Sequence, residues 1–405
     1  MKLSLKGAAV DKGYMRKMSF NERTYVATDS LCPPVANQFV FDGEGVLDPY
    51  LWRTAVAVAS EANPGARLIL KGHLAWSRWI DSGNPPRVRE IDGSRWDGHG
   101  PEGAPVLLEP LPFRESPICE VILVHGPVPR VVFRTHHGVM DGRGTLCCAE
   151  DVFRALRKEN VMGSTSTLTE VQMAESFQKQ FRRAFPVEHI APTGLPEGDA
   201  RGVIWKRRSI KGKVPLLLPR CARFAAEEAW RHAEGIVRFA VAVDMRPRRP
   251  ELRSTGNLTL DLYVEINKNT TPELIADDMA YQLRHGFEGR IKKYDQLVKY
   301  IPLRLVRFGA QKMIRDRHRK GRYGLSGIFS NLGRVDLNFF CGGGFSARSF
   351  WAVPPATEYF PFFLVLSGYE GGSELVLSVP KNLGSAGRLD DTLECIARKL
   401  EQVTR

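Results

Sequence analysis

The sequence predicts an α/β fold, an α+β sandwich arranged as two lobes, and three observations support this prediction. A chain of 405 residues is too long for one ordinary hydrophobic core and fits two. Its 43% hydrophobic and 25% charged residues are typical of a globular protein rather than a disordered one. Strand and helix patterns occur together in both halves, which favours sandwich lobes over a wound nucleotide-binding sheet.

The boundary between the lobes is predicted where the composition changes. Residues 159–170 are polar and small, and they include the run Ser164-Thr165-Ser166-Thr167. We therefore divide the chain into an N-terminal lobe, residues 1–165, and a C-terminal lobe, residues 166–405.

The N-terminal lobe begins with a predicted strand and helix. Residues 37–43 alternate in polarity and end in turn residues, which predicts a strand. Asp48 and Pro49 then have the types favoured at the N-cap and first turn of a helix. The Asn-Pro-Gly run at 63–65 ends that helix. Its apolar positions recur at helical spacing: Leu51, Ala55, Val58 and Ala59.

A hairpin is predicted later in the same lobe. Residues 85–117 are rich in proline and glycine and indicate a loop excursion with short strands. The apolar runs 118–124 and 128–135 flank Gly126-Pro127, so we expect two antiparallel strands. A helix over 144–156 follows.

The C-terminal lobe carries further elements of both kinds. The patterns predict strands at 237–243, 327–334, 360–367 and 375–379, and helices at 272–286, 297–316 and 389–403.

One heptad follows directly on the predicted hairpin. It reads His136-His137-Gly138-Val139-Met140-Asp141-Gly142. Two histidines followed at this spacing by Asp-Gly occur by chance in roughly one chain in a thousand of this size. A histidine at a strand end is well placed to act as a general base near neutral pH. Because successive side chains on a strand point to opposite faces, only one of the two histidines can serve a reacting centre.

This heptad resembles the HHxxxDG signature of the chloramphenicol-acetyltransferase-like superfamily. That group includes condensation domains of nonribosomal peptide synthetases and polyketide-associated and alcohol acyltransferases. Looser agreement extends over the helix at 48–67 and over residues 245–247, 255–257 and 330–333. The Asp-Phe-Gly-Trp-Gly box of the plant enzymes is absent. The resemblance implies two chloramphenicol-acetyltransferase-like lobes with the active site in a tunnel between them.

The resemblance also implies roles for individual residues. His137 maps onto the catalytic base, with Asp141 and Gly142 completing the predicted catalytic set. Asp141 is expected to act structurally, by capping the following helix and pairing with Arg246. Gly142 would let the thioester arm approach the backbone closely or would adopt a positive φ. His136 is expected to pack or to form hydrogen bonds locally.

Candidates for the oxyanion donor or the tunnel wall come from the other lobe. Ser330 and Asn331 belong to a Ser-Asn-Leu-Gly block that resembles a family segment bordering the tunnel. Asn257, in Thr255-Gly256-Asn257, is a similar candidate. For each of these residues, capping of its own turn is an equally good interpretation.

Seven cysteines occur without a CxxC or CxxxH spacing, so free thiols in a reducing cytoplasm are the simplest account. Adjacent ligands on a strand diverge, and we expect no metal at the heptad. Cys147 and Cys148 fit core positions of the helix rather than nucleophiles. Met1–Val10 lacks the apolar run of a signal peptide, and no stretch reaches the ~20 apolar residues of a membrane span.

The net charge of +13 is concentrated in residues 206–223 and 304–322. A solvated basic face is one interpretation; CoA phosphates, an acidic carrier protein or anionic lipid are the partners that such a field would attract. No nucleic-acid-binding motif accompanies the charge, so nucleic acid is not expected. The second stretch has the composition of a surface amphipathic helix, which allows peripheral membrane contact.

These observations predict a standalone condensation-domain-like acyltransferase and leave two alternatives open. In the predicted reaction, an acyl group passes from a CoA or carrier-protein pantetheinyl thioester directly to a small amine or alcohol, in secondary metabolism or a lipid pathway. No bound cofactor is expected besides this co-substrate, and the two-lobe plan permits a monomer. The first alternative is a non-catalytic carrier-binding module of the same fold. The second is a membrane-associated lipid or alcohol acyltransferase.

Overall fold

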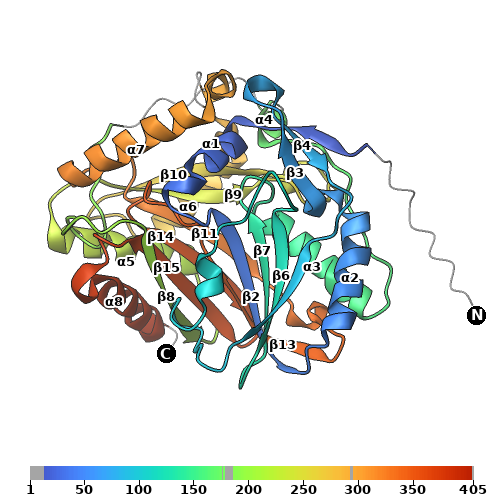
Figure 1. Ribbon diagram of the computed structural model, residues 1–405. Helices are drawn as coiled ribbons and strands as arrows, with labels where there is room; N and C mark the ends of the chain where they lie inside the picture. The colour runs from blue at the N-terminus through green and yellow to red at the C-terminus, as the bar shows by residue number, and fades with distance from the viewer. Residues whose placement is uncertain (1–12, 176, 178–185, 292–294, 404–405) are drawn as a thin grey trace, which may run out of the picture.

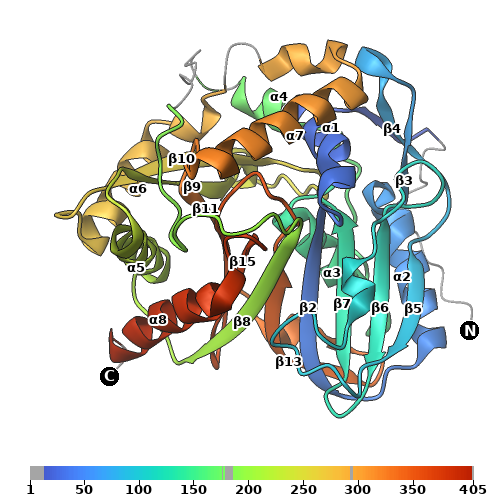
Figure 2. The same ribbon diagram turned by 60° about the vertical axis from the view of Figure 1, so that its left-hand side comes forward.

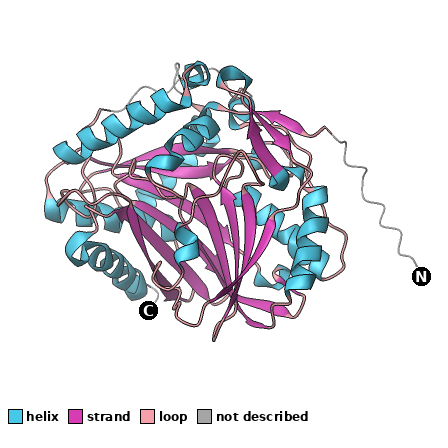
Figure 3. Cartoon of the chain, in the orientation of Figure 1, coloured by secondary structure: helices cyan, strands magenta, loops and turns pink. Residues whose placement is uncertain are grey.

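The computed structural model describes residues 13–175, 177, 186–291 and 295–403. It contains two large sheets, each of six strands, and a smaller sheet of three strands. Helices cover one side of each large sheet (Figures 1 and 2). Figure 3 shows how the helices surround the strands at the outside of the molecule. Met1–Val10, where the sequence lacks a signal-peptide pattern, lies outside the described residues.

The N-terminal sheet has the strand order β12-β13-β2-β7-β6-β5. Its strands are β2 (Ala36–Gly45), β5 (Arg87–Asp92), β6 (Cys119–His125), β7 (Arg130–His136), β12 (Cys341–Gly342) and β13 (Phe345–Val353). Neighbours are antiparallel except β5 and β6. The predicted hairpin is confirmed as β6 and β7, with Val121 opposite Phe133.

Two helices cover one face of this sheet, α2 (Pro49–Ala62) and α3 (Gly142–Leu156). Asp48 caps α2 as predicted, since its carboxylate accepts hydrogen bonds from the backbone N–H groups of Tyr50 and Leu51 at 2.8 and 3.4 Å. Large buried side chains fill the layer between helices and sheet: Phe39, Phe41, Trp52, Phe133 and Phe153. Strand β7, which leads into the heptad, and helix α3, which follows it, are thus packed in the same apolar core.

The opposite face of the sheet packs on the C-terminal lobe. Val40, Val132 and Trp351 belong to one buried cluster with Trp205 and Val376 of the other sheet. Burial of this continuous apolar surface joins the two lobes.

The C-terminal sheet has the strand order β10-β9-β11-β14-β15-β8. Its strands are β8 (Val203–Lys211), β9 (Val237–Asp244), β10 (Thr259–Ile266), β11 (Gly327–Arg334), β14 (Phe363–Tyr369) and β15 (Gly372–Pro380). The helices α5 (Leu217–His232), α6 (Pro272–Arg284) and α8 (Arg388–Val403) pack on it. The strands predicted in this half, and the helices predicted over 272–286 and 389–403, are present with shifted ends.

One segment of the C-terminal half completes the N-terminal sheet. β13 pairs with β2 over most of its length, from Phe345 opposite Gly45 to Val353 opposite Gln38. The predicted boundary at 165/166 falls in the segment between α3 and the short helix α4 (Glu170–Ala174). The chain therefore leaves the N-terminal lobe after α3, returns to it for β12 and β13, and enters the C-terminal sheet again at β14.

A smaller group of elements lies at the upper edge of the molecule in Figure 1. It contains the sheet β1-β4-β3, with β1 (Met15–Lys17), β3 (Leu68–Lys71) and β4 (Arg78–Asp81). Helix α1 (Phe20–Thr28) packs against α7 (Leu303–Lys320). The helix predicted over 297–316 is divided, because Pro302 separates a 3-10 segment, Asp295–Tyr300, from α7. Among the described helices, none has the length and apolarity needed to cross a bilayer.

Candidate active site

The heptad is a tight turn between strand β7 and helix α3. β7 ends at His136, which is paired with Ala36 of β2. The next residue stays close to that strand, because the His137 N–H donates to the Val35 carbonyl at 2.9 Å. The chain then folds back, and the His136 carbonyl accepts from the N–H groups of Val139 and Met140 at 2.8 and 3.3 Å. This turn gives the two histidine rings different surroundings.

The His137 ring has a defined tautomer. Its Nδ1 atom lies 3.1 Å from the Met140 carbonyl oxygen. A carbonyl oxygen only accepts, so Nδ1 carries the proton and Nε2 keeps its lone pair. Asn37 Nδ2 lies 3.5 Å from the same ring nitrogen, but its shorter bond, at 2.8 Å, is also to the Met140 oxygen. The ring of Tyr25 packs against the imidazole, with 4.3 Å between centroids.

Burial lowers the pKa of His137 below its ordinary value, and the opposing effects of the Met140 carbonyl and of Asp141 do not reverse that direction. The imidazole is therefore neutral at neutral pH. His137 is half-buried rather than sealed, in contrast to His136. An uncharged imidazole with a free Nε2 lone pair is the form required of a general base.

His136 has a structural environment. Its side chain is fully buried, and its Nδ1 atom accepts from the Gly138 N–H at 3.0 Å. Its Nε2 atom lies 3.7 Å from Asp29 Oδ1. Burial, with a smaller effect of His137, lowers the pKa of His136 to about 3. The local hydrogen bond expected for this residue is present.

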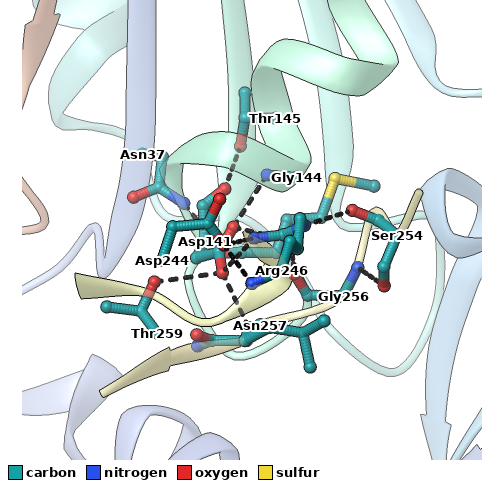
Figure 4. Close-up of polar contacts among 12 residues, drawn as sticks. Asn37, Asp141, Gly144, Thr145, Asp244, Arg246, Ser254, Gly256, Asn257 and Thr259 are labelled. Carbon is teal, nitrogen blue, oxygen red and sulfur yellow. Dashed lines mark hydrogen bonds and ion pairs between the residues drawn. The ribbon is translucent and has the colours of Figure 1, made fainter. Parts of the chain in front are cut away.

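The expected pairing of Asp141 with Arg246 is present and bidentate (Figure 4). Arg246 Nη2 donates to Asp141 Oδ1 at 3.0 Å, and Nη1 donates to Oδ2 at 3.1 Å. Asp141 also caps α3, because Oδ1 accepts from the Gly144 N–H at 2.7 Å. Oδ2 accepts from the Leu258 N–H and the Thr259 hydroxyl at 2.6 and 3.0 Å. One carboxylate thus joins the motif to both ends of the loop that leads into β10.

The charge on Asp141 is fixed. Burial alone would raise its pKa, but the Arg246 guanidinium and the hydrogen bonds from Gly144 and Leu258 hold the pKa below its usual value. Arg246 is itself held by the carbonyls of Ser254 and Gly256 at 2.9 and 2.7 Å. A carboxylate with this many donors does not exchange protons near neutral pH, so Asp141 positions the motif.

The expectation of a positive φ at Gly142 is wrong. Its φ is not positive, because it is the first residue of α3. A Cβ at this position would lie 2.8 Å from Leu332 Cδ2 and 3.3 Å from Phe39 Cζ. The glycine therefore permits close packing of the motif on Leu332, which belongs to the Ser-Asn-Leu-Gly block of the other lobe.

The three oxyanion or tunnel candidates have different environments. Asn257 is buried, and its Nδ2 atom donates to the His137 carbonyl oxygen at 2.7 Å, so it holds the backbone of the candidate base. Asn331 is exposed, and its Oδ1 atom accepts from the Gly333 N–H at 3.0 Å within its own turn. Ser330 is half-buried on β11 between β9 and β14.

Sequence reasoning missed two residues that contact His137. Tyr25 lies on α1, whose N-terminus has the capping box of Ser19 and Glu22, a pattern visible in the sequence. Asn37 is a buried polar residue near the start of β2, before its apolar run Phe39–Phe41. A buried polar side chain in such a strand needs a partner, and here the partner is the motif turn.

The cysteines next to the motif lie in the core, in agreement with the interpretation of the sequence. Cys147 and Cys148 are buried free thiols. Burial raises the pKa of Cys147, and it raises that of Cys148 to about 12. The described residues contain no cluster of His, Cys, Asp and Glu side chains able to hold a metal ion.

Two cavities are found in the described part of the chain. Their volumes are about 550 and 20 Å³, and His137 lines neither. The tunnel at His137 implied by the resemblance therefore stays a prediction.

Comparison with known proteins defines the fold. No family model and no curated protein matches the sequence. The first condensation domain of the calcium-dependent antibiotic synthetase, in complex with substrate analogue 3a, matches with a TM-score of 0.67 and 15% identity over 97% of each chain. The starter condensation domain of rhizomide synthetase, as a mutant in complex with C8-CoA and Leu-SNAC, matches with a TM-score of 0.62 and 13% identity over 96% of this chain and 94% of that one.

A third match is polyketide synthase associated protein 5 from Mycobacterium tuberculosis, with a TM-score of 0.63 and 14% identity over 96% of this chain and 98% of that chain. The chain thus has the two-lobe fold of condensation domains. This confirms the fold that the resemblance of the heptad implies.

Proposed function

We propose that this protein is an acyltransferase that moves an acyl group from a CoA or carrier-bound thioester to an amine or hydroxyl. The observation that carries the proposal is the neutral, half-buried His137, whose Nδ1–H is held by the Met140 carbonyl. The fold supports it, since one solved structure of this fold holds C8-CoA and Leu-SNAC. His137 is the proposed general base.

The proposed reaction is a direct transfer. The acceptor nitrogen or oxygen attacks the thioester carbonyl carbon, and His137 Nε2 takes the acceptor proton as the new bond forms. The tetrahedral oxyanion then collapses and the carbon–sulfur bond breaks. The departing thiolate takes the proton from the imidazolium, which restores the neutral base. The buried, protonated Cys147 and Cys148 have no part in this sequence.

The developing oxyanion needs a donor, worth on the order of 3 kcal/mol when well placed. Ser330 and Asn331 remain the proposed candidates. Leu332, next to them, packs on Gly142 of the motif, which supports a position of this block beside the reacting centre.

Thiol release from octanoyl-CoA in the presence of a panel of amines and alcohols tests the proposal. His137→Ala should reduce turnover by about 10²- to 10⁴-fold. His125→Ala is a matched control, because His125 ends the neighbouring strand β6 and its side chain is 44% exposed. Full turnover by His137→Ala would overturn the role of the base. The same assay with acyl-carrier thioesters separates the two donor classes.

A second candidate function is a carrier-binding module, and the surface of α7 favours it. In the first basic stretch, Arg207 pairs with Asp42 and Glu374, and Arg208 pairs with Glu394, so much of its charge is neutralised. On α7, Leu305 and Phe308 are 55% and 65% exposed beside exposed Arg304 and Arg307. Figure 1 shows α7 at the outer surface beside α1.

Binding of an acidic carrier protein to immobilised enzyme tests this surface. Arg304→Glu/Arg307→Glu should abolish binding, whereas Lys211→Glu/Lys213→Glu in the other basic stretch should retain it. A binding module would keep full affinity in His137→Ala and release no thiol in the transfer assay. Flotation with anionic liposomes, lost in the same α7 variant, would instead support the membrane-associated alternative.

A further inference from the structure

A cavity of about 550 Å³ opens at the N-terminal end of α1, and His137 is not among its lining residues. Its walls come from β1, α1, the 3-10 segment Leu74–Trp76, β4, α4 and the segment before α7. In Figure 1 these elements gather at the upper edge of the molecule. The volume lies in the range of small-molecule binding pockets, about 300–1,000 Å³.

The lining is strongly cationic. Five of its side chains are basic and none is acidic: Arg16, Lys17, Arg23, Arg78 and Lys299. Another part of the lining is apolar and includes Phe20, Leu74 and Tyr300.

Most of these cations lack a counterion. Arg16 pairs with Glu22, but no carboxylate of the described residues forms an ion pair with the other four. Arg23 is only 2% exposed, and its guanidinium donates to the carbonyls of Leu74, Val298 and Ile301 and to the Ser77 hydroxyl, all of them neutral. The Arg23 charge is thus hydrogen-bonded but not balanced by a carboxylate, so it adds to the positive potential of the cavity.

Nearby buried acids do not cancel this charge. Glu22 is bound by Arg16 and accepts from the Trp79 indole N–H at 3.1 Å. Glu170 lies between the lining residues Thr169 and Val171. Burial, together with the carboxylate of Glu22, raises the pKa of Glu170 to about 8, so that carboxyl is largely protonated at neutral pH.

We propose that this cavity binds an organic anion, with a carboxylate or phosphate held by Arg78 and Lys299 and an apolar body packed on Phe20, Leu74 and Tyr300. The site is separate from the imidazole and independent of the acyl transfer proposed above. It is adjacent to the motif, however, since Arg16 lines the cavity and its Nη2 atom donates to the Val139 carbonyl at 2.7 Å.

Calorimetric titration of the full chain with octyl phosphate, octanoate, inorganic phosphate and octanol tests the proposal. We expect octyl phosphate or octanoate to bind and octanol not to bind. The preferred headgroup distinguishes a phosphate site from a carboxylate site. Binding of inorganic phosphate as tight as that of octyl phosphate would show that the apolar wall contributes nothing, and would overturn the amphipathic part of the proposal.

The variant Arg78→Ala/Lys299→Ala should weaken binding of the preferred anion at least tenfold. Lys312→Ala/Arg315→Ala removes equal charge from the exposed face of α7 and should not change the affinity. Without ligand, the cavity variant should melt at the same or a higher temperature, because it removes repelling charges. Three results would each overturn the proposed site: equal affinities in both variants, binding of octanol as tight as that of the anions, or failure of both octyl phosphate and octanoate to bind.

Discussion

The Nδ1 atom of His137 and the carbonyl oxygen of Met140 lie 3.1 Å apart, and this contact explains the spacing of the motif. The turn from His137 to Met140 brings a backbone acceptor to the ring nitrogen that faces the protein. The other nitrogen keeps its lone pair. The residues between the histidine and the Asp-Gly pair thus set the tautomer of the imidazole. Arg246, through Asp141, and Asn257 then hold the turn from the other lobe.

The pH dependence of acyl transfer should reflect a histidine whose pKa is lowered by burial. Only the neutral form accepts a proton, so kcat/KM should decrease as pH falls, with a midpoint below 6.5. A rate profile measured with octanoyl-CoA checks this. A midpoint at or above 6.5 would contradict the burial argument.

Tyr25 should act through its ring rather than its hydroxyl, because the ring packs on His137 at 4.3 Å between centroids. We expect Tyr25→Phe to keep kcat within about twofold and Tyr25→Leu to lower it about tenfold, a cost of ~1.4 kcal/mol. Steady-state kinetics of both variants measure this. A large loss in Tyr25→Phe alone would instead give the phenol a direct role.

How far the sequence predicted this structure depends on the type of signal. The β6–β7 hairpin and α2 were predicted because apolar runs and the Asp48 cap are local patterns. Strand β13 was not, because its partner β2 is about 300 residues away and no local pattern reports such pairing. The helix predicted over 297–316 begins too early and ends too early, because the helical periodicity extends across Pro302 into the 3-10 segment and α7 continues to Lys320.

The candidate site shows the same difference between local patterns, which the sequence reveals, and long-range contacts, which it does not. The heptad and its resemblance predicted the pairing of Asp141 with Arg246, which is present. The contact of Asn257 with the His137 carbonyl and that of Tyr25 with its ring were not predicted. Both depend on how a loop and a helix far away in the sequence approach the motif, which is decided by tertiary packing.

Removing the charge of Asp141 should destabilise the fold strongly. Asp141→Asn leaves the buried Arg246 guanidinium with one carboxylate, and we expect a loss of about 3 kcal/mol in the free energy of unfolding. Asp244→Asn is the matched control, because Asp244 Oδ1 lies 2.6 Å from the same guanidinium but its side chain is 31% exposed. That change should cost about 1 kcal/mol or less. Urea unfolding of both variants measures the difference, and equal losses would refute the argument.

His136 should make the fold sensitive to acid. Its pKa in the folded protein is about 3, below the ordinary value of 6.5, so the unfolded chain binds the proton first as pH falls. The stability present above pH 6.5 is therefore lost as pH falls from 6.5 toward 3, by up to about 1.4 kcal/mol per pH unit. His136→Asn keeps an acceptor for the Gly138 N–H and does not titrate. The difference in unfolding free energy between wild type and variant should show this slope, and a flat difference would contradict it.

Substitution of Gly142 tests the contact between the motif and Leu332 of the other lobe. A Cβ there would lie 2.8 Å from Leu332 Cδ2, so Gly142→Ala should lower the free energy of unfolding by about 1–3 kcal/mol through overpacking. Leu332→Ala should relieve the clash, so that the second change costs less in the Gly142→Ala background than in wild type. Gly309→Ala in α7 is the control, because a Cβ there meets nothing within 4 Å; it should be neutral or stabilise by up to about 1 kcal/mol. Additive effects of the two changes in a double-mutant cycle would mean that Leu332 does not set the requirement for glycine at the start of α3.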